Sequence, residues 1–322
     1  MTKRNRSMKV ERVLVSTLMC YLPLYVAPAW SQVRALHTRD VTRLSEPQVA
    51  EQLKRNDIIF IPIGSVETNG IRPSDSNYTS ALGFAMAMAE ETGGLYFPGL
   101  VHSYPGTTVL ASSSTYMTPS QGAAFLKIVA RSLLRQGFRR QVYLSSGHGP
   151  APLTGATLAR EFFEETHVPI LYIEMGDHLR SLNISREETS KAVYGCHYIA
   201  GRLVDLPVQG DYGAKESAPV GTPPVNTGLA KLQELKYTGS LALGMWHVDP
   251  MAHGGGGGSL PRDAAEREAW GKEGAAQVRT VLKKMRVTEA MAALKEHDEF
   301  TQKVLVPKFK DKLPSISDSL VR

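Results

Sequence analysis

Apolar positions in this chain fall into two patterns: short continuous runs, and stripes with three- and four-residue spacing. Short runs bounded by turn residues predict buried strands, here at 58–63, 95–98, 141–144 and 169–173. Stripes predict amphipathic helices, here at 45–54, 77–92, 118–137, 153–165 and 262–297. Strands that alternate with helices at this spacing are typical of a mainly parallel sheet covered on both faces. We therefore expect one three-layer α/β/α domain.

Two of the predicted helices have a defined apolar face. In the first, which stops at Gly93, the residues expected to be buried are Ala81, Phe84, Ala85, Met88 and Ala89. In the second, which begins at a capping box at Thr118, they are Phe125, Ile128, Val129, Leu133 and Leu134. From Met175 to Gly239 the periodicity weakens and turn residues accumulate, so we expect loops that pass over the strand ends. A short edge strand is expected at 241–245.

The start of the chain has the composition of a targeting segment. Five basic residues between Lys3 and Arg12 precede an apolar stretch at 13–26 that is too short, and too interrupted by proline, for a spanning helix. Small residues follow, which predicts a secretory signal peptide cleaved near Ala29 to Ser31. We therefore expect a periplasmic or secreted protein with no stable membrane insertion after cleavage.

This interpretation divides the chain into three parts and changes the meaning of its charge. The expected parts are a signal peptide at 1–31, an α/β domain at 32–300 and a C-terminal tail at 301–322. Four of the six net positive charges belong to the signal peptide, which has five basic side chains and one acidic one. The remaining charge forms no basic stripe with aromatic residues, so nucleic-acid binding is not expected. Only Cys196 remains after cleavage, so no internal disulfide is expected.

Two of the predicted strands end in groups suited to chemistry. The run at 58–63 leads into Gly64-Ser65-Val66-Glu67-Thr68-Asn69-Gly70, and the run at 141–144 leads into Ser145-Ser146-Gly147-His148-Gly149. The carboxyl ends of parallel strands meet at one edge of a sheet, where open α/β folds build their sites. We therefore expect Glu67 and His148 to contribute to one site, although either motif alone is also compatible with a capped strand end.

These motifs resemble those of the creatininase family of metal-dependent amidohydrolases. The stretches that match in order are Gly64 to Gly70, Pro105-Gly106-Thr107, Gly137-Phe138 and Ser146-Gly147-His148-Gly149, within residues 45–285. The resemblance implies a creatininase-like fold, a small-molecule substrate, a homo-oligomer and a pair of divalent ions, zinc or manganese. In such a site a metal-bound water attacks an amide carbonyl that the metal polarises.

Carried over position by position, the resemblance gives Glu67 and His148 as metal ligands. Asn69 stands where the family has a histidine, and Asn77 stands where it has a bridging aspartate, with Asp75 two residues away. A neutral amide is a poor ligand for zinc or manganese, and it lacks the charge that holds two cations close together. We therefore expect one ion rather than two, or none.

The family's later catalytic stretch corresponds to residues 211–217. Glu216 matches its carboxylate, while Tyr212 stands where the family has a histidine. Tyrosine could orient a carbonyl group, but its pKa of about 10 makes it a poor proton shuttle at neutral pH. His102, from a predicted loop, is a further catalytic candidate. The residues that we expect to carry proton transfer and orientation are thus Glu216, Tyr212 and His102.

Three functions remain open from the sequence. The first is an exported amidohydrolase that acts on a small cyclic amide or another non-peptide C–N bond. The second is a non-catalytic protein of the same fold, because asparagine and tyrosine suit the recognition of a small polar ligand better than metal ligation. The third is a serine nucleophile at Ser146 or at 112–114, although no Gly-x-Ser-x-Gly elbow surrounds Ser146.

Overall fold

The architecture is that of a parallel sheet with helices on both faces. The computed structural model describes residues 36–100, 110, 113–146, 151–211, 227–235 and 260–313. The elements described below belong to one compact unit, His37–Arg322. Within the described residues, no helix combines the length and the apolar character needed to cross a membrane.

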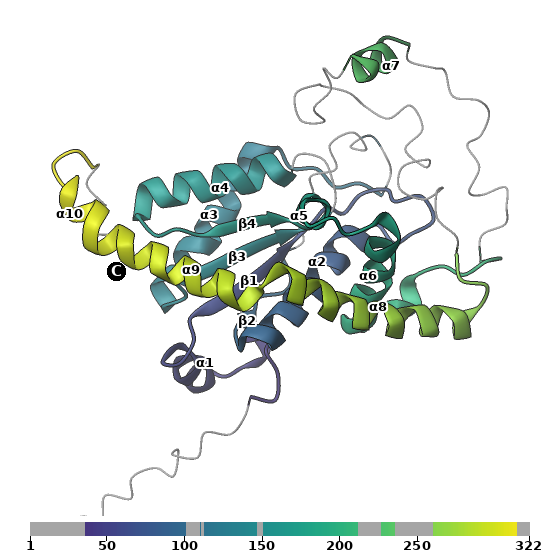
Figure 1. Ribbon diagram of the computed structural model, residues 1–322, viewed down its shortest axis with the longest axis horizontal. Helices are drawn as coiled ribbons and strands as arrows, with labels where there is room; N and C mark the ends of the chain where they lie inside the picture. The colour runs from purple at the N-terminus through teal and green to yellow at the C-terminus, as the bar shows by residue number, and fades with distance from the viewer. Residues whose placement is uncertain are drawn as a thin grey trace, which may run out of the picture. The chain divides into compact units, whose positions relative to one another are not determined.

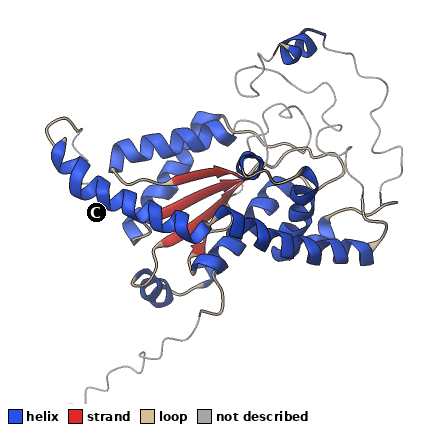
Figure 2. Cartoon of the chain, viewed as in Figure 1, coloured by secondary structure: helices blue, strands red, loops and turns tan. Residues whose placement is uncertain are grey.

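Among the residues that the structure describes, the sheet has four parallel strands in the order β2-β1-β3-β4 (Figure 2). They are β1 (Ile58–Ile63), β2 (Leu95–Tyr96), β3 (Arg140–Ser145) and β4 (Leu171–Glu174). All four lie where the apolar runs predict them. Pro62, which has no N–H to donate, is tolerated in β1 because β2 pairs only with Ile59 and Phe60 and ends before reaching it.

Helices cover both faces of the sheet, as expected for three layers (Figure 1). On one face α3 (Pro119–Gln136) packs on α4 (Ala151–Thr166), which contacts β3 and β4. On the other face α2 (Ser76–Thr92) lies on β1 and contacts α6 (Arg186–Ile199), α8 (Ala264–Met285) and α9 (Val287–Phe300). The remaining described elements are η1 (Val41–Arg43), α1 (Glu46–Leu53), α5 (Met175–Ser181), η3 (Leu203–Asp205), α7 (Thr227–Glu234), η5 (Thr301–Leu305) and α10 (Val306–Lys308).

The buried face of α2 is confirmed, and that of α3 is corrected. All five residues predicted to be buried in α2 lie in the core. In α3 the predicted stripe is displaced: Phe125 is 39% exposed and Ile128 is 61% exposed. Leu133 is buried as predicted, and the other buried residues of α3 are Gly122, Ala123, Leu126 and Ala130. Small residues on this side allow α3 to approach α4, which apolar periodicity alone does not reveal.

The described part of the predicted loop region is largely helical, which corrects the expectation for 175–239. Within it α5 follows β4 directly, and α6 begins at a capping box formed by Ser185 and Glu188. The edge strand expected at 241–245 lies outside the described residues. The predicted C-terminal helix is two helices, α8 and α9, because Arg286 adopts a left-handed conformation with φ 51° between them.

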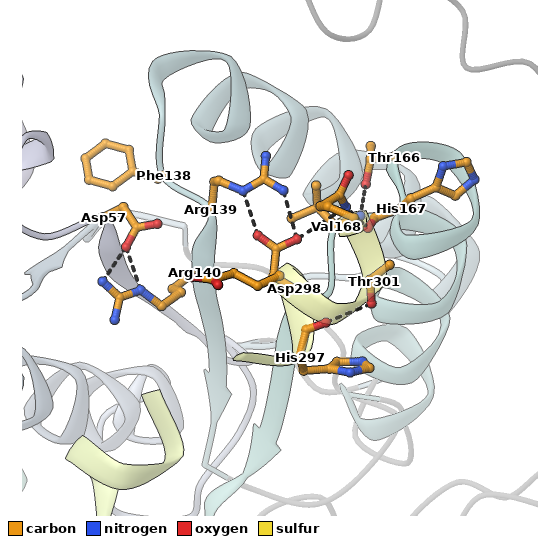
Figure 3. A network of polar contacts seen from close by, with 12 residues as sticks. Asp57, Phe138, Arg139, Arg140, Thr166, His167, Val168, His297, Asp298 and Thr301 are labelled. Carbon is orange, nitrogen blue, oxygen red and sulfur yellow. Dashed lines mark hydrogen bonds and ion pairs between the residues drawn. The ribbon is translucent and has the colours of Figure 1, made fainter. Parts of the chain in front are cut away.

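A network of polar contacts ties the C-terminal helices to the amino end of the sheet (Figure 3). Arg139, just before β3, donates to both carboxylate oxygens of Asp298 in α9, at 2.7 and 2.8 Å. Gln302, one turn further, donates to the backbone carbonyl of His167 at 2.6 Å. Because these contacts join residues more than 130 positions apart, they fix α9 and η5 against the loops that precede β3 and β4.

Candidate functional site

The loop from β1 to α2 forms a narrow hairpin at the carboxyl end of the sheet. At its base the Glu67 N–H donates to the Ser74 carbonyl at 2.9 Å, and at its tip Asn69 bridges Arg72. Gly70, with φ 59°, supplies the left-handed conformation that a two-residue hairpin turn requires. The hairpin therefore holds Glu67 in a fixed position past the end of β1.

Gly64 sets how closely this loop approaches α2. A Cβ at Gly64 would lie 2.5 Å from Tyr78 Cα and 2.7 Å from Tyr78 N, so no larger residue fits without a shift of the backbone. Tyr78 is itself fixed, because its hydroxyl accepts a hydrogen bond from Gly99 N at 2.6 Å. The glycine of the first motif is thus needed for the contact between β1 and the start of α2.

Glu67 is buried, with 2% of its surface exposed, and its Oε1 accepts two hydrogen bonds. Ser65 Oγ donates at 2.6 Å and Asn77 Nδ2 donates at 2.9 Å. The same amide donates to Ser65 Oγ at 3.0 Å, so the three side chains form a closed Ser65–Glu67–Asn77 triangle. A carboxylate out of water needs such donors. The triangle fixes the orientation of the Glu67 carboxylate.

The opposite face of the hairpin is attached to a second loop. Thr68 Oγ1 lies 2.5 Å from Ser113 Oγ, and Thr68 N donates to Ser114 Oγ at 3.2 Å. Thr115 N also donates to the Val66 carbonyl, at 3.1 Å. Two of the serines considered as nucleophiles therefore bind the hairpin, while Ser112 lies outside the described residues.

Asp75 is part of a charged cluster with the end of α6. Arg202 binds both carboxylate oxygens of Asp75, one of them at 3.4 Å, and also binds Asp205 at 2.9 Å. His197 in α6 lies within this cluster and is 1% exposed, and burial lowers its pKa to about 4. The charge of Asp75 opposes that fall, and by geometry neither ring nitrogen has a hydrogen-bond partner among the described residues.

The ends of β3 and β4 contribute further polar groups to the same edge of the sheet. Ser145 Oγ lies 2.6 Å from Tyr172 Oη. Glu174, which pairs in register with Ser145, caps α5 by accepting from Gly176 N and Asp177 N. Sequence reasoning missed Glu174, although a strand end followed directly by a helix is a signal for a capping residue.

Half of the predicted site residues can be placed. The structure brings Glu67 and Asn77 together, places Asn69 at the tip of the same hairpin, and directs Asp75 to Arg202. The others, His102, His148, Tyr212 and Glu216, lie outside the described residues. The roles of all eight in metal binding or catalysis stay predictions. Sequence reasoning missed Ser65 and Arg202, and it did not select His197 from the histidines that could reach the cleft.

Comparisons with known proteins agree with the motifs. The family model described as creatinine amidohydrolase matches residues 42–201. The matched region, residues 42–201, belongs to the creatininase family. None of the curated proteins compared with it gives a match.

Solved creatininases are also similar to the chain. A putative creatinine amidohydrolase from Bacteroides fragilis is 16% identical with a TM-score of 0.49, over 80% of this chain and 96% of that one. A creatinine amidohydrolase is 12% identical with a TM-score of 0.47, over 77% and 97%. A manganese creatininase is 13% identical with a TM-score of 0.45, over 77% and 98%.

The described residues do not fit a pair of ions bridged at position 77. A bridging ligand would present oxygen lone pairs, whereas Asn77 directs an N–H at Glu67 Oε1. Asp75 binds Arg202 with both carboxylate oxygens. Nowhere in the described ranges do three His, Cys, Asp or Glu residues gather as a metal site would require. A single ion at Glu67 would need ligands from outside the described residues, and the motifs supply His148 as a candidate.

Proposed function

We propose that this chain is an exported amidohydrolase of the creatininase type, which uses at most one divalent ion on a small cyclic amide or another non-peptide C–N bond. The observation that carries the proposal is the buried Glu67 carboxylate at the carboxyl end of β1, fixed by Ser65 and Asn77. A buried carboxylate at this edge of the sheet is costly for folding, and that cost is typical of functional sites.

The chain's own residues would have distinct roles in this reaction. Glu67 and His148 would hold the ion, which when bound activates water and polarises an amide carbonyl. Asn77 would keep the Glu67 carboxylate oriented through its hydrogen bond. Glu216 or His102 would pass a proton to the leaving nitrogen, and Tyr212 would orient the carbonyl group.

Metal binding is the first test of this proposal. We expect the metal-free protein to take up about one equivalent of zinc or manganese in calorimetric titration, and expect Glu67→Gln and His148→Ala to abolish that uptake. Glu165→Gln is the control, because that carboxylate lies on α4 and pairs with Lys127 and Arg131. Uptake that survives Glu67→Gln would refute this placement of the site.

Hydrolysis is the second test. The metal-loaded protein is incubated with a panel of lactams and cyclic amides, and ring opening is followed by the appearance of a free amine. We expect a turnover that Glu67→Gln removes and that Glu165→Gln retains.

A second candidate function is the binding of a small polar ligand without catalysis. It is favoured by the Ser65–Glu67–Asn77 triangle, in which hydrogen bonds take the place that metal coordination would have. This function predicts no metal uptake, together with a higher melting temperature of the metal-free protein when a member of the same panel binds. Metal uptake with turnover would exclude it.

Export and assembly belong to the proposal as well. We expect the full chain, expressed in a Gram-negative host, to be recovered from the periplasm or medium with a new N-terminus near Ala29 to Ser31. N-terminal sequencing measures this directly, and an intact Met1 in that fraction would contradict it. Light scattering on the same preparation tests the homo-oligomer that the resemblance implies.

A further inference from the structure

One face of the β1–α2 hairpin collects polar side chains beside Glu67. Asn69 and Arg72 are directly opposite each other in the hairpin, so their side chains lie on the same face. Glu67 is two residues before Asn69 and shares that face, because side chains alternate along extended backbone. Thr68 points the other way, as its contact with Ser113 shows.

Arg72 is a half-buried cation on this face without a bonded acceptor. Among the described residues, no carboxylate or carbonyl group binds its guanidinium. The charge of Arg72 acts on two residues of α6. Burial lowers the pKa of His197, and Arg72 lowers it further. Burial raises the pKa of Tyr194, and Arg72 opposes that rise. Arg72 therefore lies close enough to α6 for its charge to act on His197 and Tyr194.

Two buried hydrogen-bonding groups near Arg72 also lack partners. Asn69 is 8% exposed, and its Nδ2 makes no hydrogen bond in the described part of the chain. The same holds for both ring nitrogens of His197. Buried polar groups are almost always satisfied. Such a gathering of unsatisfied groups indicates a bound molecule or ordered water.

The charges around these groups favour an anion over a cation. The one carboxylate that acts on His197, that of Asp75, is already neutralised by Arg202. What remains available is a guanidinium, an amide N–H and a neutral imidazole with one N–H and one acceptor nitrogen, so donors outnumber acceptors. A guanidinium in this setting matches the two oxygens of a carboxylate or phosphate group.

We propose that Asn69, Arg72 and His197 form an oxyanion subsite beside Glu67, which takes a carboxylate or phosphate group of the molecule bound there. The proposal rests on the proposed function for the use of that site and names its substrate class, a small cyclic amide with an anionic substituent. Ordered water that satisfies the same donors is the alternative.

Small probes separate these outcomes. The metal-free protein is titrated at constant ionic strength with inorganic phosphate and acetate. It is also titrated with 5-oxoproline and 2-pyrrolidinone, which share a lactam ring but differ in a carboxylate. We expect phosphate or acetate to bind, Arg72→Gln to weaken that binding at least about tenfold, and Arg72→Lys to recover part of it. We also expect 5-oxoproline to bind better than 2-pyrrolidinone, a preference that Arg72→Gln removes.

The control variant is Arg135→Gln, which removes one positive charge from an exposed position on α3. It should leave all four titrations unchanged. Anion binding that is absent from the native protein, or equal in Arg72→Gln, would overturn the subsite and favour ordered water. A lack of preference for 5-oxoproline would overturn the assigned substrate class.

The subsite and the hydrolase can fail separately. Anion binding through Arg72 with no metal uptake at Glu67 would keep the subsite and refute the hydrolase. Metal uptake and turnover with no anion binding would refute only the subsite. Circular dichroism of each variant confirms that it folds.

Discussion

The polar groups at the two ends of the sheet differ in how completely they are paired. At the amino end, Arg139 binds Asp298 through two hydrogen bonds and Arg140 binds Asp57 at 2.5 Å (Figure 3). At the carboxyl end, buried polar atoms of Asn69 and His197 have no partner among the described residues. The charges at the amino end are matched, whereas the carboxyl end has unused hydrogen-bonding groups beside its Asp75–Arg202 pair.

This difference indicates that the amino end contributes mainly to stability and the carboxyl end to binding. Matched pairs at the amino end join α9 to the sheet and present nothing to a ligand. Unmatched groups at the carboxyl end cost free energy of folding, which is tolerated where a ligand later satisfies them. His167 is the exception at the amino end: its carbonyl accepts from Gln302, but both nitrogens of its buried ring lack partners in the described region.

The largest expected effect comes from lowering the pH, and it acts through the carboxyl end. The pKa of His197 is lowered by burial from 6.5 to about 4, so the unfolded chain binds the proton first as pH falls. The free energy of unfolding should therefore fall between pH 6.5 and pH 4. At about 1.4 kcal/mol per pKa unit the loss is about 3 kcal/mol. Urea unfolding at several pH values measures it.

The control for this effect is His197→Gln, which cannot titrate. Its unfolding free energy should vary by about 3 kcal/mol less than that of the native chain between pH 6.5 and pH 4. The readout is the change with pH rather than the absolute stability. Equal pH dependence in the two proteins would show that His197 is not the group that makes stability fall at low pH.

A comparable test of the two ends uses the glycines that flank β1 and α2. Gly64→Ala at the carboxyl end places a Cβ 2.5 Å from the Tyr78 backbone, and we expect a loss of about 2 to 3 kcal/mol and weaker metal uptake. Gly94→Ala at the amino end meets Ile58 at 3.0 Å, and about 1 kcal/mol is expected with metal uptake unchanged. Equal effects of the two substitutions on metal uptake would show that the carboxyl end is no more important for metal binding than the amino end.

Breaking the Arg139–Asp298 pair tests the amino end directly. Asp298→Ala leaves a partly exposed guanidinium without its partner, so we expect about 2 kcal/mol of destabilisation, with anion and metal binding unaffected. Lys303→Ala is the control, since its pair with Glu299 is exposed and should contribute less than about 0.5 kcal/mol. Loss of ligand binding in Asp298→Ala would show that the two ends are coupled.

The sheet could be predicted from the sequence because each strand is a short apolar run bounded by turn residues. Part of the buried surface of α2 could be predicted because Ala81, Phe84, Ala85, Met88 and Ala89 recur at three- and four-residue spacing, although burial extends around most of the helix. The stripe of α3 could not, because Phe125 and Ile128 are apolar yet exposed, and the small residues Gly122 and Ala123 form the contact face. Helix α6 was missed because its first turns are polar, although its capping box was readable.

In the site, too, contacts between residues that are close in the sequence could be predicted, and contacts between distant residues could not. Glu67 and Asn77 lie ten positions apart at one strand end and helix start, so the motif alone brings them close. The partner of Asp75 could not be predicted, because Arg202 follows it by 127 positions and no local pattern links them. The same holds for His197 beside Arg72, whose proximity depends on how α6 packs on α2.

The smallest expected effect on stability also tests most directly whether the carboxyl end of the sheet can bind metal ions. Asn77→Asp replaces the N–H that binds Glu67 with a second carboxylate, so repulsion should destabilise the metal-free protein by about 1 kcal/mol at pH 7. Zinc or manganese should then restore stability and raise the melting temperature more than in the native chain, because binding to the folded state stabilises it. Asn56→Asp, whose amide donates to the Thr92 carbonyl at the amino end, should show no such rescue. If metal rescues Asn77→Asp no better than Asn56→Asp, the residue at position 77 does not decide how many ions the site holds.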